Sequence, residues 1–172
     1  MRNEEKILLI ISLLIVIFLF VLINFQEPPE PEEFVKNKTV VNYSTLFFKY
    51  EILKYPSSVE ILALESINES TVLGFVTEPW NLDFGIIPGN GSFVTRNIEI
   101  ANPGEKNNKI ILKAYGNISP LVVFSRNNFI LKPKEKVSID IFLYSKNSDP
   151  GNYSGEIDVI AQKGIYNFLS IT

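Results

Sequence analysis

The order of apolar and polar positions divides this chain into one uninterrupted apolar run and a long region of alternating character. The run extends from Ile7 to Ile23, and Ser12 is its one polar residue. As an α-helix it would rise about 26 Å, close to the roughly 30 Å hydrocarbon thickness of a bilayer. We therefore expect a transmembrane helix over residues 7–23, with membrane lipid as its partner. A cleaved signal peptide is the alternative, but the residues that follow, Asn-Phe-Gln, are not the small residues of a cleavage site.

The charges beside the run predict its orientation. Arg2 and Lys6 precede it, whereas residues 24–35 contain no Lys or Arg. Because basic residues are retained on the cytoplasmic side, we expect residues 1–6 to form a cytoplasmic tail and the remainder to lie outside the cell. Residues 24–33 are rich in proline and glutamate. This composition predicts an extended stalk that holds the next domain off the membrane surface.

Beyond about residue 72, apolar and polar positions alternate with a period of two. Each alternating run predicts a strand with one buried face. Turn signals such as Pro-Gly-Asn-Gly and Asn-Pro-Gly separate the runs. Short strands at this spacing predict an all-β fold, an antiparallel sandwich of about seven strands over residues 72–172. The residues expected to form its core include Val94, Ile98, Ile100, Ile110, Leu112, Ile139, Ile141, Leu143, Ile157 and Val159.

Residues 34–71 carry a mixed pattern, which we interpret as a mixed or β extension that packs on the sandwich. Residues 44–55 would suit a short amphipathic helix, because apolar residues recur there at helical spacing. Their aromatic and β-branched content would equally suit a strand. Residues 58–65 and 70–76 predict two strands around the turn Ser-Ile-Asn-Glu-Ser.

Four short motifs follow one another in the sandwich region. They are Leu-Asp-Phe-Gly at 82–85, Ile-x-Ile-x-Asn-x-Gly at 98–104, Phe-x-Leu-x-Pro at 129–133 and Pro-Gly-x-Tyr-x-Gly at 150–155. This succession resembles immunoglobulin-like sandwich domains of the ASPM/Hydin and major-sperm-protein type, especially those of small single-span extracellular proteins of archaea. The resemblance covers about residues 72–172 and implies a structural or binding role without catalytic residues. One departure is Lys134, which follows Pro133 where such domains often carry glycine.

Large apolar residues beside the turns of this region favour a scaffold. Phe84 and Trp80 are expected to plug one end of the sandwich, and a binding surface on Trp80 is the alternative. Gly85 and Gly91 permit turn conformations that other residues resist.

The composition excludes several classes of chemistry. The chain has no His and no Cys, so it lacks the commonest general base, the thiolate nucleophile and all disulfides. Its net charge of −3 argues against nucleic acid as a partner. Residues 147–152 would bind a cation weakly at best, and no carboxylate pair stands in a recognisable context. We therefore expect neither enzymatic activity nor a cofactor, and no small-molecule ligand.

Two kinds of surface site are predicted. Asn-x-Ser/Thr sequons beyond the apolar run predict N-glycosylation at Asn37, Asn42, Asn68, Asn90, Asn117 and Asn152. The sequon-free stretches 134–145 and 165–171 contain aromatic residues on the outward phase of their strands. Exposed aromatics would mark a partner surface formed by Phe142, Tyr144, Tyr166 and Phe168. The alternative is that these side chains are buried.

The function best supported by the sequence is a non-enzymatic, membrane-anchored component of the cell surface or envelope that binds another protein through its extracellular sandwich. One alternative is a subunit of a surface filament or of its anchoring stator. Another is a glycan-binding module of the cell envelope. Exposed coplanar aromatics would favour glycan binding, and a bare edge strand would favour strand addition by a protein.

Overall fold

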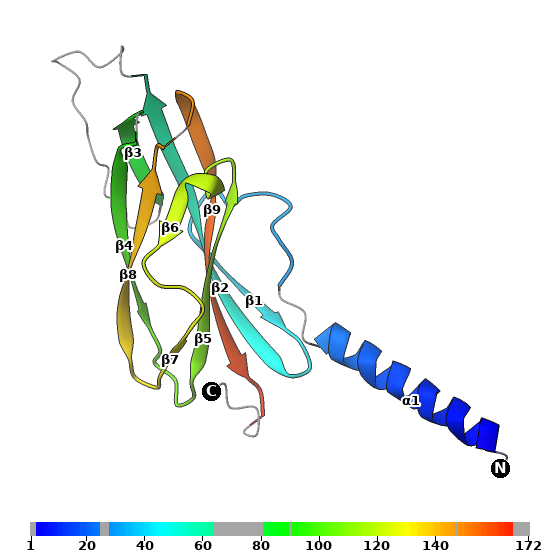
Figure 1. The fold of residues 1–172 in the computed structure, drawn as a ribbon. Helices are drawn as coiled ribbons and strands as arrows, with labels where there is room; N and C mark the ends of the chain where they lie inside the picture. Colours follow the sequence, from blue (N-terminus) through cyan, green and yellow to red (C-terminus); the bar gives the residue numbers. More distant parts are fainter. Residues whose placement is uncertain (1–2, 25–27, 64–80, 90, 147, 167–172) are drawn as a thin grey trace.

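The chain folds into two β-sheets and one N-terminal helix (Figure 1). The computed structural model describes residues 3–24, 28–63, 81–89, 91–146 and 148–166, and the side chains of residues 3 and 22–24 lie outside that description. The two sheets pack face to face, and their inward side chains form one continuous apolar core. A β-sandwich is therefore the architecture of the chain beyond the helix.

The larger sheet has six described strands, and the last strand that the structure describes lies in its interior. In spatial order the strands are β1 (Thr39–Ser44), β2 (Phe48–Leu62), β9 (Gly151–Gly164), β5 (Asn108–Gly116) and β7 (Phe129–Leu131), and β3 (Leu82–Pro88) also pairs with β2. β9 pairs with β2 on one side and with β5 on the other.

The smaller sheet consists of β4 (Phe93–Ala101), β8 (Lys136–Tyr144) and β6 (Val122–Phe124), in the order β4-β8-β6. The short 3-10 helix η2 (Ser119–Leu121) leads into β6. Nine strands are described in all, and seven of them, β3 to β9, fall within residues 72–172, where about seven were expected. The pairings are antiparallel except that of β2 with β3, which is parallel and departs from the fully antiparallel expectation.

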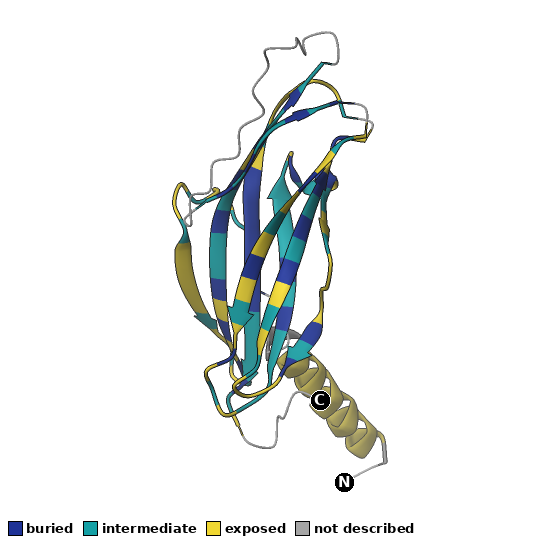
Figure 2. Ribbon diagram, turned by 90° about the vertical axis from the view of Figure 1, so that its left-hand side faces the viewer, coloured by how far each residue is buried: buried dark blue, intermediate teal, exposed yellow. Residues whose placement is uncertain are grey.

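The period-two alternation of the sequence is confirmed by burial (Figure 2). Along β8, buried Ile139, Ile141 and Leu143 alternate with positions that are half-buried or exposed. Ile100 is half-buried and packs against the core. The other expected core residues are buried, namely Val94, Ile98, Ile110, Leu112, Ile157 and Val159.

The first residues of β3 have a structural role. Phe84 is fully buried in the core, whereas Trp80 lies outside the described residues. Gly85 has a φ of 72°, and the pairing register of β2 with β3 shifts at this level. The Asp83 carboxylate accepts a hydrogen bond from the Gly85 N–H at 2.9 Å. A left-handed residue at an irregularity of the sheet explains why glycine stands there.

Residues 48–62 form β2, so the strand alternative is confirmed for most of the segment that the sequence left open. β2 is bordered by β9 along one edge and by β1 and β3 along the other. It is thus a central member of the larger sheet, whereas the pattern predicted an extension over residues 34–71 that packs on the sandwich. The partners of β2 lie far away in the sequence, so a local pattern does not reveal its place. The strand expected at 70–76 lies outside the described residues.

Residues 28–38 lie against the sandwich. Pro28 is buried, and the N–H of Val35 donates to Glu156 Oε2 at 2.7 Å. Of the stalk expected over residues 24–33, Pro28 is buried, residues 29, 30, 32 and 33 are exposed, and residues 25–27 lie outside the described residues, so the stalk stays a prediction.

The apolar N-terminal run is helical, as expected, and forms α1 (Asn3–Asn24). The large apolar side chains described along it are exposed. In the described part of the chain, no helix combines the length and the apolarity needed to cross a membrane. The ring of Phe20 meets the ring of Phe47, in the turn between β1 and β2, edge-on with 5.7 Å between their centres.

Candidate interaction surface

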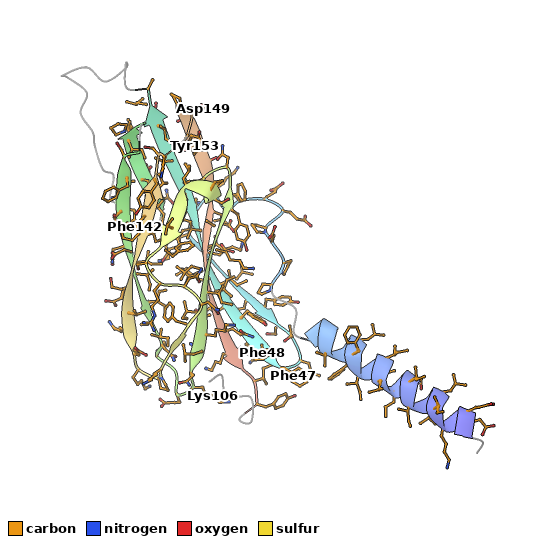
Figure 3. All side chains as sticks on the ribbon, in the orientation of Figure 1. Phe47, Phe48, Lys106, Phe142, Asp149 and Tyr153 are labelled. Atoms are coloured by element: carbon orange, nitrogen blue, oxygen red, sulfur yellow. The ribbon has the colours of Figure 1, made fainter. Side chains whose placement is uncertain are left out.

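An aromatic patch lies on the outer face of the smaller sheet. Tyr144 and Phe142 of β8 pair in register with Phe93 and Thr95 of β4, and Val123 of β6 pairs with Phe142. Phe93, Val123 and Tyr144 are 61%, 50% and 38% exposed. Phe142, labelled in Figure 3, is half-buried between them. We call Phe93, Val123, Phe142 and Tyr144 the aromatic patch.

The alternation of β8 places these side chains outside. Ile141 and Leu143 are fully buried, so the residues between and after them must point to the opposite face. The rings of Phe93 and Tyr144 are 5.6 Å apart and inclined at 33°, and those of Phe142 and Tyr144 are 6.2 Å apart and inclined at 31°. The rings therefore support one another as a compact cluster.

The remainder of the same face is polar. The Asn97 amide donates to Asp140 at 2.7 Å and its oxygen accepts from the Ser138 hydroxyl at 2.7 Å. Farther along, Lys136 and Glu99 form an exposed ion pair at 3.0 Å. An apolar cluster beside hydrogen-bonded polar groups has the composition of a protein interface with its rim.

The structure brings together two of the four aromatics that the sequence singled out as a partner surface. Phe142 and Tyr144 are neighbours in the aromatic patch. Tyr166 is 43% exposed but follows β9 at the opposite end of the sandwich, and Phe168 lies outside the described residues. Phe93 and Val123 were missed. The sequence did contain a signal for both residues. Each is a large apolar residue at a position where the alternation of its strand predicts a polar, outward-facing side chain.

The sequons fall on exposed sites where they are described. Asn37, Asn42, Asn117 and Asn152 are exposed, and Asn68 and Asn90 lie outside the described residues. Asn117 also has a structural contact, because its side-chain oxygen accepts a hydrogen bond from the Ser154 N–H at 2.6 Å. Glycosylation of these asparagines stays a prediction.

A buried ionic cluster lies on the outer face of the larger sheet. Lys54 Nζ is 2.5 Å from Glu156 Oε1 and 3.3 Å from Asp158 Oδ2. Glu156 and Asp158 are buried, and the Val35 N–H bonds the second oxygen of Glu156. Asp158 Oδ1 is buried without a hydrogen-bond partner among the described residues. The sequence did not reveal this cluster, because Glu156 and Asp158 occupy the outward phase of β9, where charges are usually solvated.

Burial raises the pKa of the Asp158 carboxyl from 3.8 to about 7. A hydrogen bond with Glu156 and the charge of Glu156 act in the same direction, while the Lys54 ammonium opposes them. For Lys54, burial lowers the pKa, but the hydrogen bond to Glu156 and the attraction of both carboxylates outweigh it and raise the pKa above its ordinary value. The cluster is thus a proton-sensitive structural contact between β2, β9 and residues 28–38.

Asn102 links the ends of several strands. Its buried amide Nδ2 donates to the carbonyls of Lys106 at 2.8 Å and of Leu131 and Lys132 at 3.0 Å, and its Oδ1 accepts from the Gly104 N–H at 3.1 Å. The sequence predicted a turn at Asn-Pro-Gly but not this bridge between the β4–β5 loop and the end of β7. The role is structural.

A cleft of about 340 Å³ opens between the sheets. Leu53, Ile98, Ile110 and other core residues line it, and Asn108 Oδ1 is buried in the same region without a hydrogen-bond partner among the described residues. In the described part of the chain, no cluster of His, Cys, Asp or Glu has the composition to hold a metal ion. The cleft is an opening of the core.

Comparison with protein families, with curated proteins and with solved structures finds no significant match.

Proposed function

We propose that this chain is a membrane-anchored component of the cell surface that binds another protein through the aromatic patch. The observation that carries the proposal is the joint exposure of Phe93, Val123 and Tyr144 on one sheet face. Apolar side chains gathered on an otherwise polar surface are typical of binding sites, and aromatic residues are enriched in the centres of protein interfaces. The sequence motifs resemble those of immunoglobulin-like domains, and that resemblance implies a structural or binding role for the sandwich.

Glycan binding by the same patch is the second candidate, favoured by the exposed aromatic rings. Sugars stack on flat platforms, whereas these rings are inclined to one another at 33° and 31°. Closely packed, inclined rings match an irregular protein surface better than they match a sugar. We therefore rank a protein first, and the experiment below separates the two.

Anchoring through residues 7–23 is the second part of the proposal. The described side chains from Ile7 to Val21 are exposed on all sides of α1, an arrangement suited to lipid. The described helical stretch includes the charged residues 4–6, whereas the apolar run continues in the sequence to Ile23. Basic residues before the run favour an outside location for the sandwich. Carbonate washing should leave the full chain in the membrane, and its release would contradict the anchor.

A site-specific crosslink tests the binding surface. A photoreactive amino acid at Phe93 of the full chain, irradiated in native membranes, should give a discrete protein adduct. Val123→Thr should reduce that adduct several-fold, because it removes an apolar contact beside Phe142 in the aromatic patch. Val40→Thr is the matched control, since Val40 is 52% exposed and lies on β1.

The outcomes distinguish the candidates. Equal adduct yields from the Val123→Thr and Val40→Thr proteins would contradict a protein interface at the patch. Binding to isolated envelope polysaccharide that falls with Val123→Thr, in the absence of a protein adduct, would establish the glycan alternative instead.

A further inference from the structure

The end of the sandwich nearest α1 carries exposed apolar side chains. Leu46, in the turn between β1 and β2, is 47% exposed, and Tyr166, just after β9, is 43% exposed. The two segments are held together, because the Ile165 N–H donates to the Phe47 carbonyl at 2.8 Å. Figure 3 shows Phe47 at this end of the molecule, beside the end of α1. We call Leu46, Phe47 and Tyr166 the basal tip.

The contact with α1 defines where the basal tip lies along the helix axis. Phe47 meets Phe20, which lies three residues before the end of the apolar run at Ile23. Three residues correspond to about 4.5 Å along a helix axis. If the run occupies the hydrocarbon core, Phe47 lies at the boundary between hydrocarbon and headgroups. Leu46 and Tyr166 then lie in the same zone, where amphipathic aromatic rings are favoured.

Charge at this end complements an anionic surface. Figure 1 and the strand pairings place the β1–β2 turn, the β4–β5 loop, the β7–β8 turn and the end of β9 together at the base. Here seven lysines outnumber four glutamates by three, although the whole chain has a net charge of −3. The basal charges are Lys49, Lys106, Lys109, Lys132, Lys134, Lys136 and Lys163, with Glu51, Glu99, Glu105 and Glu135. Lysines around exposed apolar side chains suit anionic lipid headgroups.

We propose that the basal tip sits in the headgroup region of the bilayer that holds α1, with anionic lipid as its partner. The inference rests on the proposed anchoring of residues 7–23. It adds that the sandwich stands close to the membrane, because Pro28 is buried and Val35, a few residues farther on, is held by Glu156. The aromatic patch, near the other end of β8, then lies at the end of the sandwich farther from the bilayer.

Depth-dependent quenching tests this placement, and the absence of native cysteine makes the labelling simple. Three single-cysteine variants of the full chain, Leu46→Cys, Val123→Cys and Ile15→Cys, carry a bimane label. Each is reconstituted in vesicles of equal parts phosphatidylcholine and phosphatidylglycerol, with bromine on the acyl chains near the carbonyl. Leu46 and Val123 are 47% and 50% exposed, so they form a matched pair at opposite ends.

We expect strong quenching at positions 15 and 46 and several-fold weaker quenching at 123. If the label at position 15 is quenched but the label at position 46 is quenched as weakly as that at position 123, the inference is overturned and the anchor stays intact. Absence of quenching at 15 would overturn the anchor. Quenching at 46 alone would then support a membrane contact by the tip without a spanning helix.

A second comparison tests whether the basal lysines contribute to the membrane contact. Lys49→Gln with Lys132→Gln removes two exposed basal charges, and Lys36→Gln with Lys146→Gln removes two exposed charges away from the base. Quenching at position 46 should fall several-fold in the first pair and persist in the second. Equal quenching in both pairs would contradict the assignment of anionic lipid.

Discussion

Lys54 and Glu156 are 102 residues apart in sequence, yet their Nζ and Oε1 atoms are 2.5 Å apart on the outer face of the larger sheet. The two residues join β2 to β9, and Glu156 in turn holds Val35. A buried ion pair of this kind contributes little net stability compared with apolar packing, but its disruption is costly because it leaves a charge without compensation.

Lys54→Met should therefore destabilise the domain by about 3–5 kcal/mol, because Glu156 and Asp158 would remain buried together without a cation. Urea unfolding followed by circular dichroism measures the change. Lys136→Met is the control, since its pair with Glu99 is exposed and should contribute less than about 1 kcal/mol. Equal losses for the two variants would show that the buried cluster is not held by Lys54.

The raised pKa of Asp158 predicts a dependence of stability on pH. A folded-state pKa of about 7, above the ordinary value of 3.8, means that the folded protein holds this proton more tightly. The stabilisation is fully present below about pH 4 and is lost as the pH rises through 7. Relative to Asp158→Asn, wild type should lose on the order of 1–3 kcal/mol of unfolding free energy between these limits. Parallel pH profiles for the two proteins would contradict the assignment.

Asn102→Ala should destabilise the domain by about 2–4 kcal/mol, because it removes several buried hydrogen bonds and leaves backbone carbonyls without a donor. Thermal unfolding should show a decrease in melting temperature of about 2–4 °C per kcal/mol. Asn97→Ala serves as the control, since Asn97 makes its side-chain bonds on an exposed face. A loss no larger than that of the control would refute the bridging role.

Lys134 has a φ of 62°, a conformation that glycine adopts without strain. Lys134→Gly should therefore raise the unfolding free energy by about 0.5–1 kcal/mol, the relief of strain exceeding the added freedom of the unfolded chain. Lys134→Ala also removes the exposed pair with Glu105 but keeps the β-carbon, so it should show no gain. If Lys134→Ala raises the unfolding free energy as much as Lys134→Gly, the gain comes from loss of the lysine side chain and not from relief of backbone strain.

Local pattern was sufficient for the faces of β4 and β8 and for the helical N-terminal run, because each depends on residues close in sequence. The sequence left the turn after Pro133 in doubt, because Lys134 stands where immunoglobulin-like domains of the resembled type often carry glycine. In the structure Lys134 adopts the backbone conformation that glycine favours.

The central position of β2 in the larger sheet could not be predicted from the sequence, because two of its neighbours, β9 and the parallel β3, are distant in the chain. The same reason explains the missed ionic cluster. Glu156 looks solvent-facing by alternation, but it is buried and bonds Lys54 and the Val35 N–H, both more than 100 residues away in sequence. The aromatic patch was half foreseen: Phe142 and Tyr144 share one strand, whereas Phe93 and Val123 join them through pairing with β4 and β6.

The central position of β9 has a consequence for how the protein is made. Chain synthesis delivers β2 and β5 long before the strand that must pair with both of them. Until β9 has been synthesised to Gly164, β2 and β5 each have an unpaired edge, and such an edge is a template for pairing with another chain. Such non-local closure is slow and exposes a partly made domain to aggregation. The larger sheet can therefore be completed only late in synthesis, after β9 has been made and can pair with β2 and β5.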